Sequence, residues 1–205
     1  MARYIAIAGT IGAGKSSLTD FLCKQYGLRP FFEPNAQNPY LSDFYADMAR
    51  WSFHSQVFFL THKFRLQREL ETQTLATVVQ DRTIYEDAEI FAENLFRQGH
   101  MSARDHDTYR ALYAELLKVL APPDLLIFLR APGRTLRKRI ALRGRPEEQK
   151  IAPAYLKQLS ALYEEWFSAY KMSETMVIDT SELDYLEDLV DRLDLMKKIE
   201  KYVGR

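Results

Sequence analysis

The sequence predicts an α/β fold in which a five-stranded parallel sheet carries helices on both faces. Short apolar runs, rich in β-branched and aromatic residues, alternate with stretches of helical periodicity. Such nearly continuous apolar strands are typical of a parallel sheet buried on both faces. A glycine-rich loop after the first run agrees, since parallel sheets bind ligands at the carboxyl ends of their strands. The five expected strands are Tyr4–Ala8, Arg29–Glu33, Thr77–Asp81, Leu125–Arg130 and Thr175–Asp179.

The first strand leads into the loop Gly9-Thr10-Ile11-Gly12-Ala13-Gly14-Lys15-Ser16, which fits the pattern G-x-x-x-x-G-K-[S/T] at every fixed position. A helix over Ser16–Gly27 is expected to follow. Glycines let backbone N–H groups surround phosphates, and the helix N-terminus adds the positive end of its dipole. Lys15 would reach the β- and γ-phosphates, and the Ser16 hydroxyl would hold Mg²⁺. A glycine-rich turn with a chance lysine is disfavoured because strand, loop and helix are all in register, so we expect a nucleoside triphosphate site.

The second and third strands end in carboxylates at the same edge of the sheet. Glu33 is a candidate general base, because phosphoryl transfer to a hydroxyl needs a carboxylate within hydrogen-bond reach of the attacking oxygen. By sequence alone it could equally be an acid in a surface turn. Asp81 stands where an acid commonly orients Mg²⁺ or its waters. It could also cap the next helix, for which Thr83 is another candidate.

Between these strands, Ala46–Leu70 is predicted to form one long helix that is apolar nearly all round and therefore largely buried. One face carries polar residues at steps of seven, four and seven, which are Tyr45 at the helix start, Ser52, Gln56 and Lys63. If that face is buried, the Gln56 amide could bond a base edge and Tyr45 a sugar hydroxyl. The same spacing also fits a stripe that faces solvent.

After the fourth strand, six basic residues follow closely: Arg134, Arg137, Lys138, Arg139, Arg143 and Arg145. Arg139 and Arg143 share a helical face, and Arg143-Gly144-Arg145 then leaves the helix. Several arginines on a lid can neutralise charge on a transferring phosphoryl group while they exclude water. The other explanation is a basic helix face in solvent. Because a phosphate loop is present, we favour a lid over about residues 139–150.

Composition limits the remaining possibilities. The chain of 205 residues fits a single domain over residues 1–205. Lys+Arg and Asp+Glu both number 28, and this balance argues against a general nucleic-acid or membrane-surface binder. The single cysteine, Cys23, is expected in the core, and the four histidines show no metal-ligand spacing. Without a signal peptide or a membrane-length apolar run, we expect a cytoplasmic protein, and Leu183–Arg205 reads as an amphipathic helix.

Four segments stand in order beside the phosphate loop: Glu33-Pro34, Arg50-Trp51-Ser52-Phe53-His54-Ser55-Gln56, Asp81-Arg82-Thr83-Ile84-Tyr85-Glu86-Asp87 and Arg139-x-x-x-Arg143-Gly144-Arg145-x-x-Glu148. Together they resemble the deoxynucleoside kinase family over nearly the whole chain. Within it the chain is most similar to the bacterial deoxyadenosine kinase type, some members of which also take deoxycytidine. The related deoxyguanosine kinases tend to differ around the Asp-Arg-Thr segment. The resemblance implies a P-loop kinase fold.

The resemblance also implies catalytic roles. Glu33 is similar to the base that takes the proton from the sugar 5′-hydroxyl, and Arg82 to the arginine that steadies the 5′-oxygen and the phosphates. Asp81 would lie near Mg²⁺ with Ser16. The groups that would stabilise the transferring phosphate are Lys15 and the lid arginines Arg139, Arg143 and Arg145. The implied ATP-binding residues are Gly9, Thr10, Ile11, Gly12, Ala13, Gly14, Lys15, Ser16, Ser17 and Arg143.

Further positions resemble the residues that bind the deoxynucleoside. Gln56 and Asp87 match the pair that hydrogen-bonds the nucleobase. Phe91, four residues after Asp87, matches the aromatic residue that stacks on the base. Tyr45 and Glu148 match the pair that binds the 3′-hydroxyl, which would favour deoxyribose.

Two positions depart from the family's commoner pattern. Lys63 stands where many members have an arginine next to the base-binding aspartate, and a single ammonium cannot make the same forked contact. Asp81 replaces the glutamate of the animal members, although bacterial ones often have aspartate. The first departure bears on base preference, while the second hardly changes the mechanism.

The sequence therefore predicts an enzyme that transfers the γ-phosphoryl group of ATP, with Mg²⁺, to the 5′-hydroxyl of a deoxynucleoside in nucleotide salvage. Deoxyadenosine is the first choice of acceptor, and deoxyguanosine or deoxycytidine is the alternative. A nucleoside monophosphate kinase would need more basic residues near the second strand, and a P-loop switch protein would need a water-positioning switch region. The family also implies a homodimer with helices such as Ala46–Leu70 at the interface, and small molecules rather than nucleic acid or membrane as partners.

Overall fold

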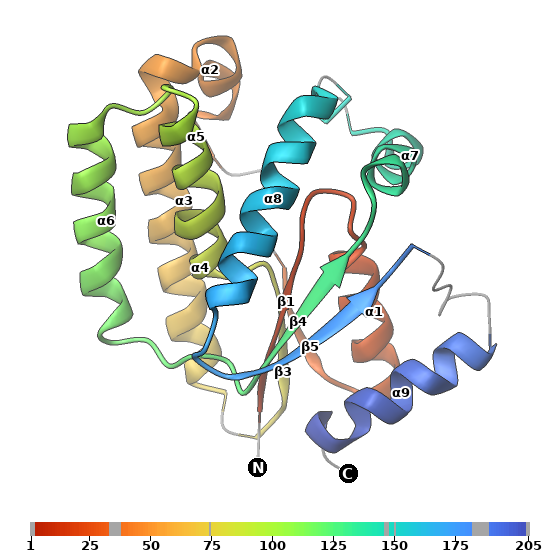
Figure 1. Cartoon of the computed structure of the whole chain (residues 1–205). Helices are drawn as coiled ribbons and strands as arrows, with labels where there is room; N and C mark the ends of the chain where they lie inside the picture. The colour runs from red at the N-terminus through yellow and green to blue at the C-terminus, as the bar shows by residue number, and fades with distance from the viewer. Residues whose placement is uncertain are drawn as a thin grey trace.

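The centre of the molecule is a parallel sheet with the strand order β2-β3-β1-β4-β5 (Figure 1). The computed structural model describes residues 3–32, 38–73, 75–145, 148–149, 151–181 and 189–203. The predicted five-stranded parallel sheet is confirmed. Its strands are β1 (Tyr4–Ala8), β2 (Arg29–Phe31), β3 (Val78–Asp81), β4 (Leu125–Arg130) and β5 (Glu174–Asp179).

Helices connect the strands and cover the sheet. In chain order they are α1 (Lys15–Tyr26), α2 (Leu41–Ala46), α3 (Met48–Glu71), α4 (Ile84–Glu86), the π-helical segment η2 (Asp87–Ala92), α5 (Glu93–Arg97), α6 (Ala103–Leu117), α7 (Gly133–Arg143), α8 (Pro153–Ala169) and α9 (Leu189–Val203). Among the described residues, no helix combines the length and the apolar composition that a membrane span requires.

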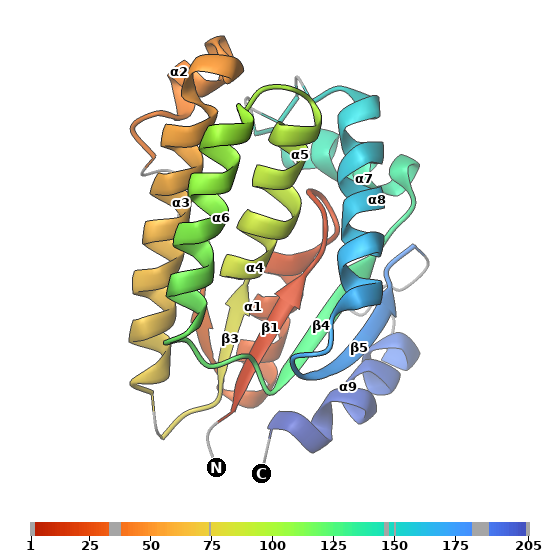
Figure 2. The same ribbon diagram turned by 60° about the vertical axis from the view of Figure 1, so that its left-hand side comes forward.

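The sheet is buried on both faces because its side chains alternate between them. Every residue of the central strand β1 is buried. Ile7 of β1 lies in one apolar cluster with Leu22 of α1 and Ile199 of α9. Ala6 belongs to the opposite cluster, with Leu159 of α8. Figures 1 and 2 accordingly show α1 and α9 on one side of the sheet and α8 on the other.

The register brings the ends of β1 and β3 together. Ile7, one residue before the end of β1, pairs with Asp81, the last residue of β3. The residues that follow these strands therefore meet at one edge of the sheet, where ligands bind in parallel folds. The second strand ends at Phe31, two residues earlier than predicted, and Glu33 lies outside the described residues.

The long helix differs from its prediction in one boundary. A short helix, α2, ends at Ala46, and α3 begins at Met48 after Asp47, whose side chain accepts a hydrogen bond from the Arg50 N–H at 3.1 Å. An acidic N-cap of this kind fixes a helix start. Tyr45 therefore lies on α2, and its predicted place on the same helix face as Gln56 is wrong.

The polar face of α3 points into the protein. Ser52, Gln56 and Lys63 are all buried, so the alternative of a solvent-facing stripe is wrong. On other parts of the same helix Phe58 and Phe59 are partly exposed, and the expectation of a helix that is buried nearly all round is wrong there. A buried polar face needs hydrogen-bond partners, so this face of α3 is a candidate ligand surface.

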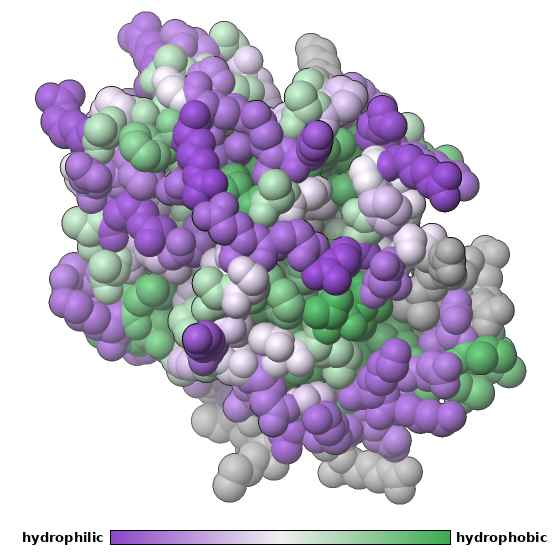
Figure 3. Space-filling model, in the orientation of Figure 1, coloured by the Kyte–Doolittle hydropathy of each residue, from purple (hydrophilic) through white to green (hydrophobic). Residues whose placement is uncertain are grey.

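The terminal helix α9 runs from Leu189 to Val203, and the other residues of the predicted Leu183–Arg205 helix lie outside the described residues. Its amphipathic character is confirmed, because Leu195 and Ile199 are buried while Asp194 and Lys197 are exposed, and Figure 3 shows hydrophilic residues on the outer side of this helix.

Candidate active site

The glycine-rich loop turns tightly between β1 and α1. Gly12 has a φ of 81°, in the left-handed region that favours glycine. A Cβ at this residue would lie 2.8 Å from the carbonyl oxygen of Leu136 on α7 and 3.1 Å from a carbon of Ile140. Both the backbone conformation and the space therefore require glycine, and the loop lies directly against α7.

Lys15 at the start of α1 lies within the loop. Its side chain is buried, and Nζ donates hydrogen bonds to the carbonyl oxygens of Gly9 at 2.7 Å and Thr10 at 3.2 Å. The N-cap of α1 is Gly14, which supplies no side-chain cap, and the first turn contains no acidic residue. An uncapped helix N-terminus beside an ammonium group is well suited to bind phosphate.

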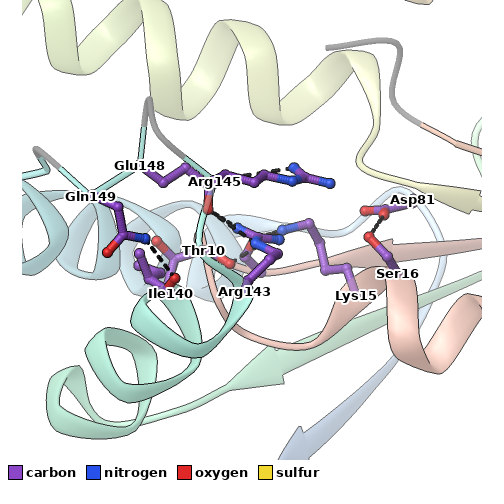
Figure 4. A network of polar contacts seen from close by, with 10 residues as sticks. Thr10, Lys15, Ser16, Asp81, Ile140, Arg143, Arg145, Glu148 and Gln149 are labelled. Atoms are coloured by element: carbon purple, nitrogen blue, oxygen red, sulfur yellow. Dashed lines mark hydrogen bonds and ion pairs between the residues drawn. The ribbon is translucent and has the colours of Figure 1, made fainter. Parts of the chain in front are cut away.

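Ser16 and Asp81 form a direct pair across the ends of β1 and β3. The Ser16 hydroxyl donates to Oδ2 of Asp81 at 2.5 Å (Figure 4). The other carboxylate oxygen, Oδ1, is buried and has no hydrogen-bond partner among the described residues. A hydroxyl and a carboxylate with a buried oxygen still to be satisfied are oxygen ligands of the kind that Mg²⁺ prefers. The residues thus fit the predicted metal site, and Thr83 occupies the N-cap position of α4 that the sequence left open.

Arg82, next to Asp81, has an unusual backbone. Its φ is 63°, the one positive value at a non-glycine position among the described residues. Such a conformation costs roughly 1–2 kcal/mol. The Arg82 N–H donates to the carbonyl of Ile7 at 3.1 Å, and its own carbonyl accepts from Nζ of Lys63 at 2.7 Å. Its guanidinium carbon lies 4.4 Å from the ring centroid of Phe91.

Lys63 is the residue at which the sequence departs from the commoner family pattern, and it contacts the backbone of Arg82. Lys63 is fully buried on α3, and its ammonium holds the backbone of Arg82. The resemblance placed this side chain among the substrate-binding residues. The structure gives Lys63 a hydrogen bond to the Arg82 carbonyl, which supports the chain around this candidate catalytic arginine.

The predicted base-binding residues lie on two elements that contact each other, α3 and η2. Gln56 of α3 is 5% exposed, and Asp87, the first residue of η2, is 3% exposed. Phe91 follows one turn later on η2 and is partly buried. The amide oxygen Oε1 of Gln56 is buried without a hydrogen-bond partner in the described part of the chain. A buried acceptor of this kind needs a donor, and a bound ligand can supply one.

The lid arginines fall into two groups. Arg139 of α7 donates to Oγ1 and O of Thr180, at 2.8 and 2.7 Å, and to the carbonyl of Ala13 at 3.3 Å. It therefore joins α7 to the phosphate loop and to the end of β5. Arg143 and Arg145 form ion pairs with Glu148, with Nε of Arg143 3.0 Å from Oε2.

Figure 4 shows the Glu148 network of the lid together with Lys15 and the Ser16–Asp81 pair. The Gln149 amide adds a hydrogen bond to the Ile140 carbonyl at 2.9 Å, which links the segment after α7 back to that helix. Tyr45, the expected partner of Glu148, is on α2 and is 47% exposed.

Two residues of this region were missed by the sequence reasoning. Tyr155 of α8 lies near Tyr45, Asn94 and Arg82, and its burial, with a smaller effect of Tyr45, raises the pKa of Tyr155 to about 12. Only the fold brings this tyrosine to the site. Glu86 is fully buried beside the phosphate loop. Its spacing from Thr83 matches a capping box and could have been recognised in the sequence.

The fold and the site define a class of protein. A glycine-rich loop with an uncapped helix, a hydroxyl–carboxylate pair at the next strand and an arginine-rich segment opposite are the parts of a P-loop phosphotransferase. A family model described as deoxynucleoside kinase matches residues 5–204. The chain belongs to the deoxynucleoside kinase family.

Individual relatives agree with this family but differ in substrate. The chain is 37% identical to the deoxyadenosine/deoxycytidine kinase of Bacillus subtilis, over 90% of this chain and 85% of that protein. It is 38% identical to a deoxyguanosine kinase of Lactobacillus acidophilus, over 98% and 92% of the two chains. Among solved structures, deoxyadenosine kinase from M. mycoides with dCMP and a flexible dCDP bound has a TM-score of 0.85 and 31% identity, covering 97% of this chain and 99% of that one.

The predicted enzyme class is therefore confirmed: the protein is an ATP-dependent deoxynucleoside kinase. This result favours the expected activity over the monophosphate kinase and the switch protein. Since relatives of similar identity act on different bases, the choice of base needs a separate argument.

Proposed function

We propose that this enzyme transfers the γ-phosphoryl group of ATP to the 5′-hydroxyl of deoxyadenosine, in nucleotide salvage. Deoxycytidine or deoxyguanosine is the alternative acceptor. The buried Oε1 of Gln56, which has no hydrogen-bond partner in the described part of the chain, supports a base that offers a hydrogen-bond donor, and the similarity to deoxyadenosine kinases favours deoxyadenosine among such bases. Adenine carries an amino group beside a ring nitrogen that accepts, so one glutamine amide can bond both. Cytosine has the same arrangement, whereas guanine presents an oxygen where these bases present the amino group.

Asp87 supports the same assignment. An ionised carboxylate only accepts hydrogen bonds. Together with Oε1 of Gln56 it places two acceptors on α3 and η2, which favours a base edge that carries hydrogen-bond donors such as an amino group. Phe91, one turn beyond Asp87, would stack on the base and already lies beside the Arg82 guanidinium.

For the phosphoryl transfer, we assign Glu33 as the general base that takes the proton from the 5′-hydroxyl. Arg82 would steady the attacking oxygen and the γ-phosphate. Lys15 would exchange its hydrogen bonds with Gly9 and Thr10 for the β- and γ-phosphates of ATP. These groups act by position and charge, because phosphoryl transfer requires little covalent chemistry from the protein.

Ser16 and Asp81 are the residues that would hold Mg²⁺. When bound, the ion supplies positive charge to the β- and γ-phosphates. Arg143 and Arg145 would close over the same phosphates, while Glu148, which now pairs with both arginines, would bind the 3′-hydroxyl with Tyr45. Arg139 would support the loop from α7 through its contact with Ala13.

We also propose that the chain is one cytoplasmic domain that assembles as a homodimer through α3. Phe58 and Phe59 of α3 are partly exposed. The neighbouring helix α6 adds Leu112, which is 39% exposed. Apolar side chains that two neighbouring helices expose together favour a protein interface.

The experiment that tests the function is ATP-dependent phosphorylation of a panel: four deoxynucleosides, adenosine and the deoxynucleoside monophosphates. We expect deoxyadenosine to be phosphorylated fastest, and Glu33→Gln to reduce kcat about 10³-fold. Glu69→Gln, an exposed acid on α3, serves as the matched control and should keep full activity. Preference for deoxyguanosine would overturn the assignment of the base pocket. Turnover of monophosphates alone would overturn the assigned acceptor.

A further inference from the structure

Glu86, the last residue of α4, is a fully buried carboxylate with no role in the mechanism described above. A buried charge is costly unless hydrogen bonds and opposite charges compensate it. Burial raises the pKa of Glu86, and the positive charges of Lys15 and Arg82 act in the opposite direction. This carboxylate therefore lies within the electrostatic reach of two residues that we place at the phosphates.

Both oxygens of Glu86 accept hydrogen bonds from separate parts of the chain. Oε1 accepts from the Gly9 N–H at 3.3 Å and from the Tyr163 hydroxyl at 2.8 Å. Oε2 accepts from the Thr83 N–H at 2.8 Å and from the Thr83 hydroxyl at 3.2 Å. Two of these donors are backbone N–H groups, which cannot reverse their polarity. An ionised carboxylate, which accepts at both oxygens, is the group that matches them.

Two of the three partners belong to the elements that make up the phosphate site, and the third lies on the neighbouring helix α8. Gly9 is the first residue of the phosphate loop, Thr83 stands two residues after Asp81, and Tyr163 lies on α8. The Ser16–Asp81 pair crosses between the same loop and the same strand end. A change in the distance between Gly9 and Thr83 would therefore also change the relation of Ser16 to Asp81.

We propose that Glu86 is a positioning residue for phosphoryl transfer, whose carboxylate fixes the phosphate loop relative to the Asp81–Thr83 segment. The proposal rests on the roles given above to Ser16, Asp81 and Arg82. Through these contacts Glu86 sets the geometry in which ATP and its metal ion are bound, without touching either.

Glu86→Gln distinguishes the effect of the hydrogen bonds of Glu86 from the effect of its charge. One end of a glutamine amide is an NH₂ group, which must face the N–H of Gly9 or of Thr83, so one anchor is lost. Removing the negative charge near Lys15 would by itself strengthen the binding of an anion. The two effects on ATP affinity have opposite signs. If Glu86 acts by holding the loop in place, losing one of its hydrogen bonds should weaken ATP binding.

The test compares Glu86→Gln with Glu89→Gln, three residues further on, where the carboxylate is partly exposed and pairs with Arg110 at 2.9 Å. Binding of ATP with Mg²⁺ is measured by isothermal titration calorimetry, which needs no acceptor. We expect Glu86→Gln to weaken ATP binding at least tenfold, to lower kcat about 100-fold, and to raise the half-saturating Mg²⁺ concentration about tenfold. Glu89→Gln should stay within about twofold of the wild type for all three quantities.

A folding defect is detected by thermal unfolding of each variant. If Glu86→Gln does not fold, Tyr163→Phe decides, because it removes one donor to Oε1 and leaves the charge in place. We expect it to weaken ATP binding about threefold. Unchanged or tighter ATP binding in the folded variant would overturn the proposal. Failure of the wild type to phosphorylate any deoxynucleoside would instead contradict the proposed function, while leaving the ATP-binding result interpretable.

Discussion

The phosphate side and the lid side of the site are held together differently. On the phosphate side, backbone conformation and buried groups fix each part: Gly12 lies against α7, and Lys15 and Asp81 are 8% and 4% exposed. On the lid side, the Arg143 and Arg145 side chains are 35% and 46% exposed, and ion pairs with Glu148 hold them. Buried, hydrogen-bonded groups are costly to displace, whereas exposed ion pairs contribute little to stability.

The phosphate side of the site is therefore already formed without substrate, and the lid side is not. The triphosphate end of the reaction is built before any substrate arrives, and the lid keeps its charged groups paired with each other. Substrate can therefore replace the partners of the lid arginines at small cost, while the loop provides the fixed reference.

Lys15→Met should have the largest effect. Its ammonium is the buried cation of the loop, and we expect kcat/KM for ATP to fall about 10³-fold in steady-state assays. Lys24→Met, at the exposed end of the same helix, is the control and should change nothing. A fall of less than tenfold for Lys15→Met would show that the fixed side does not govern the reaction.

Lys63→Met tests whether the buried hydrogen bond from Lys63 also fixes the position of Arg82. Without the hydrogen bond to its carbonyl, Arg82 should lose its left-handed conformation and its place over Phe91. We expect kcat to fall about 100-fold, with KM for ATP nearly unchanged. Lys63→Arg should recover part of this loss, because a guanidinium can also donate to the carbonyl. Equal losses of kcat in both variants would contradict this role of Lys63.

Gln56→Leu addresses the acceptor pocket. The change keeps the volume but removes the amide, so we expect kcat/KM for deoxyadenosine to fall about tenfold to thirtyfold. Binding of ATP alone, measured by calorimetry, should stay within about twofold of the wild type. Gln25→Leu on the exposed part of α1 is the matched control.

Glu148→Gln should have the smallest effect, and it sharpens the contrast between the two sides. Since its partners are exposed arginines, the free energy of unfolding should change by less than about 1 kcal/mol in urea denaturation. KM for the deoxynucleoside should rise about fivefold as the expected 3′-hydroxyl contact weakens. A large loss of stability would mean that the lid is as rigidly built as the phosphate loop.

The sequence was most informative where local patterns and fold agree. The buried strands, the loop from Gly9 to Ser16 and the family could all be predicted, because apolar runs and fixed motif spacing report them directly. The boundary between α2 and α3 was missed although Asp47 is a recognisable N-cap. In a long apolar stretch, that single residue was outweighed by helical periodicity.

The orientation of the α3 polar face could not be read from periodicity. A helix with polar residues on one side and aromatic residues on another fits two orientations, and the choice depends on what it packs against. Arg139 and Glu86 present the same difficulty, because their partners Thr180 and Gly9 are distant in the chain. Local sequence carries no information on contacts of that range.

The contact of Gly12 with the Leu136 carbonyl has a thermodynamic consequence. At Gly12 the loop packs so closely against α7 that it cannot move toward the helix without displacing it. Arg139 of α7 also donates to the Ala13 carbonyl of the loop, so a movement of the loop toward α7 would displace the helix that carries Arg139 and Arg143. Affinity at the loop and affinity at the lid are thereby linked. By reciprocity, the factor by which ATP alters the binding of the acceptor is also the factor by which the acceptor alters the binding of ATP.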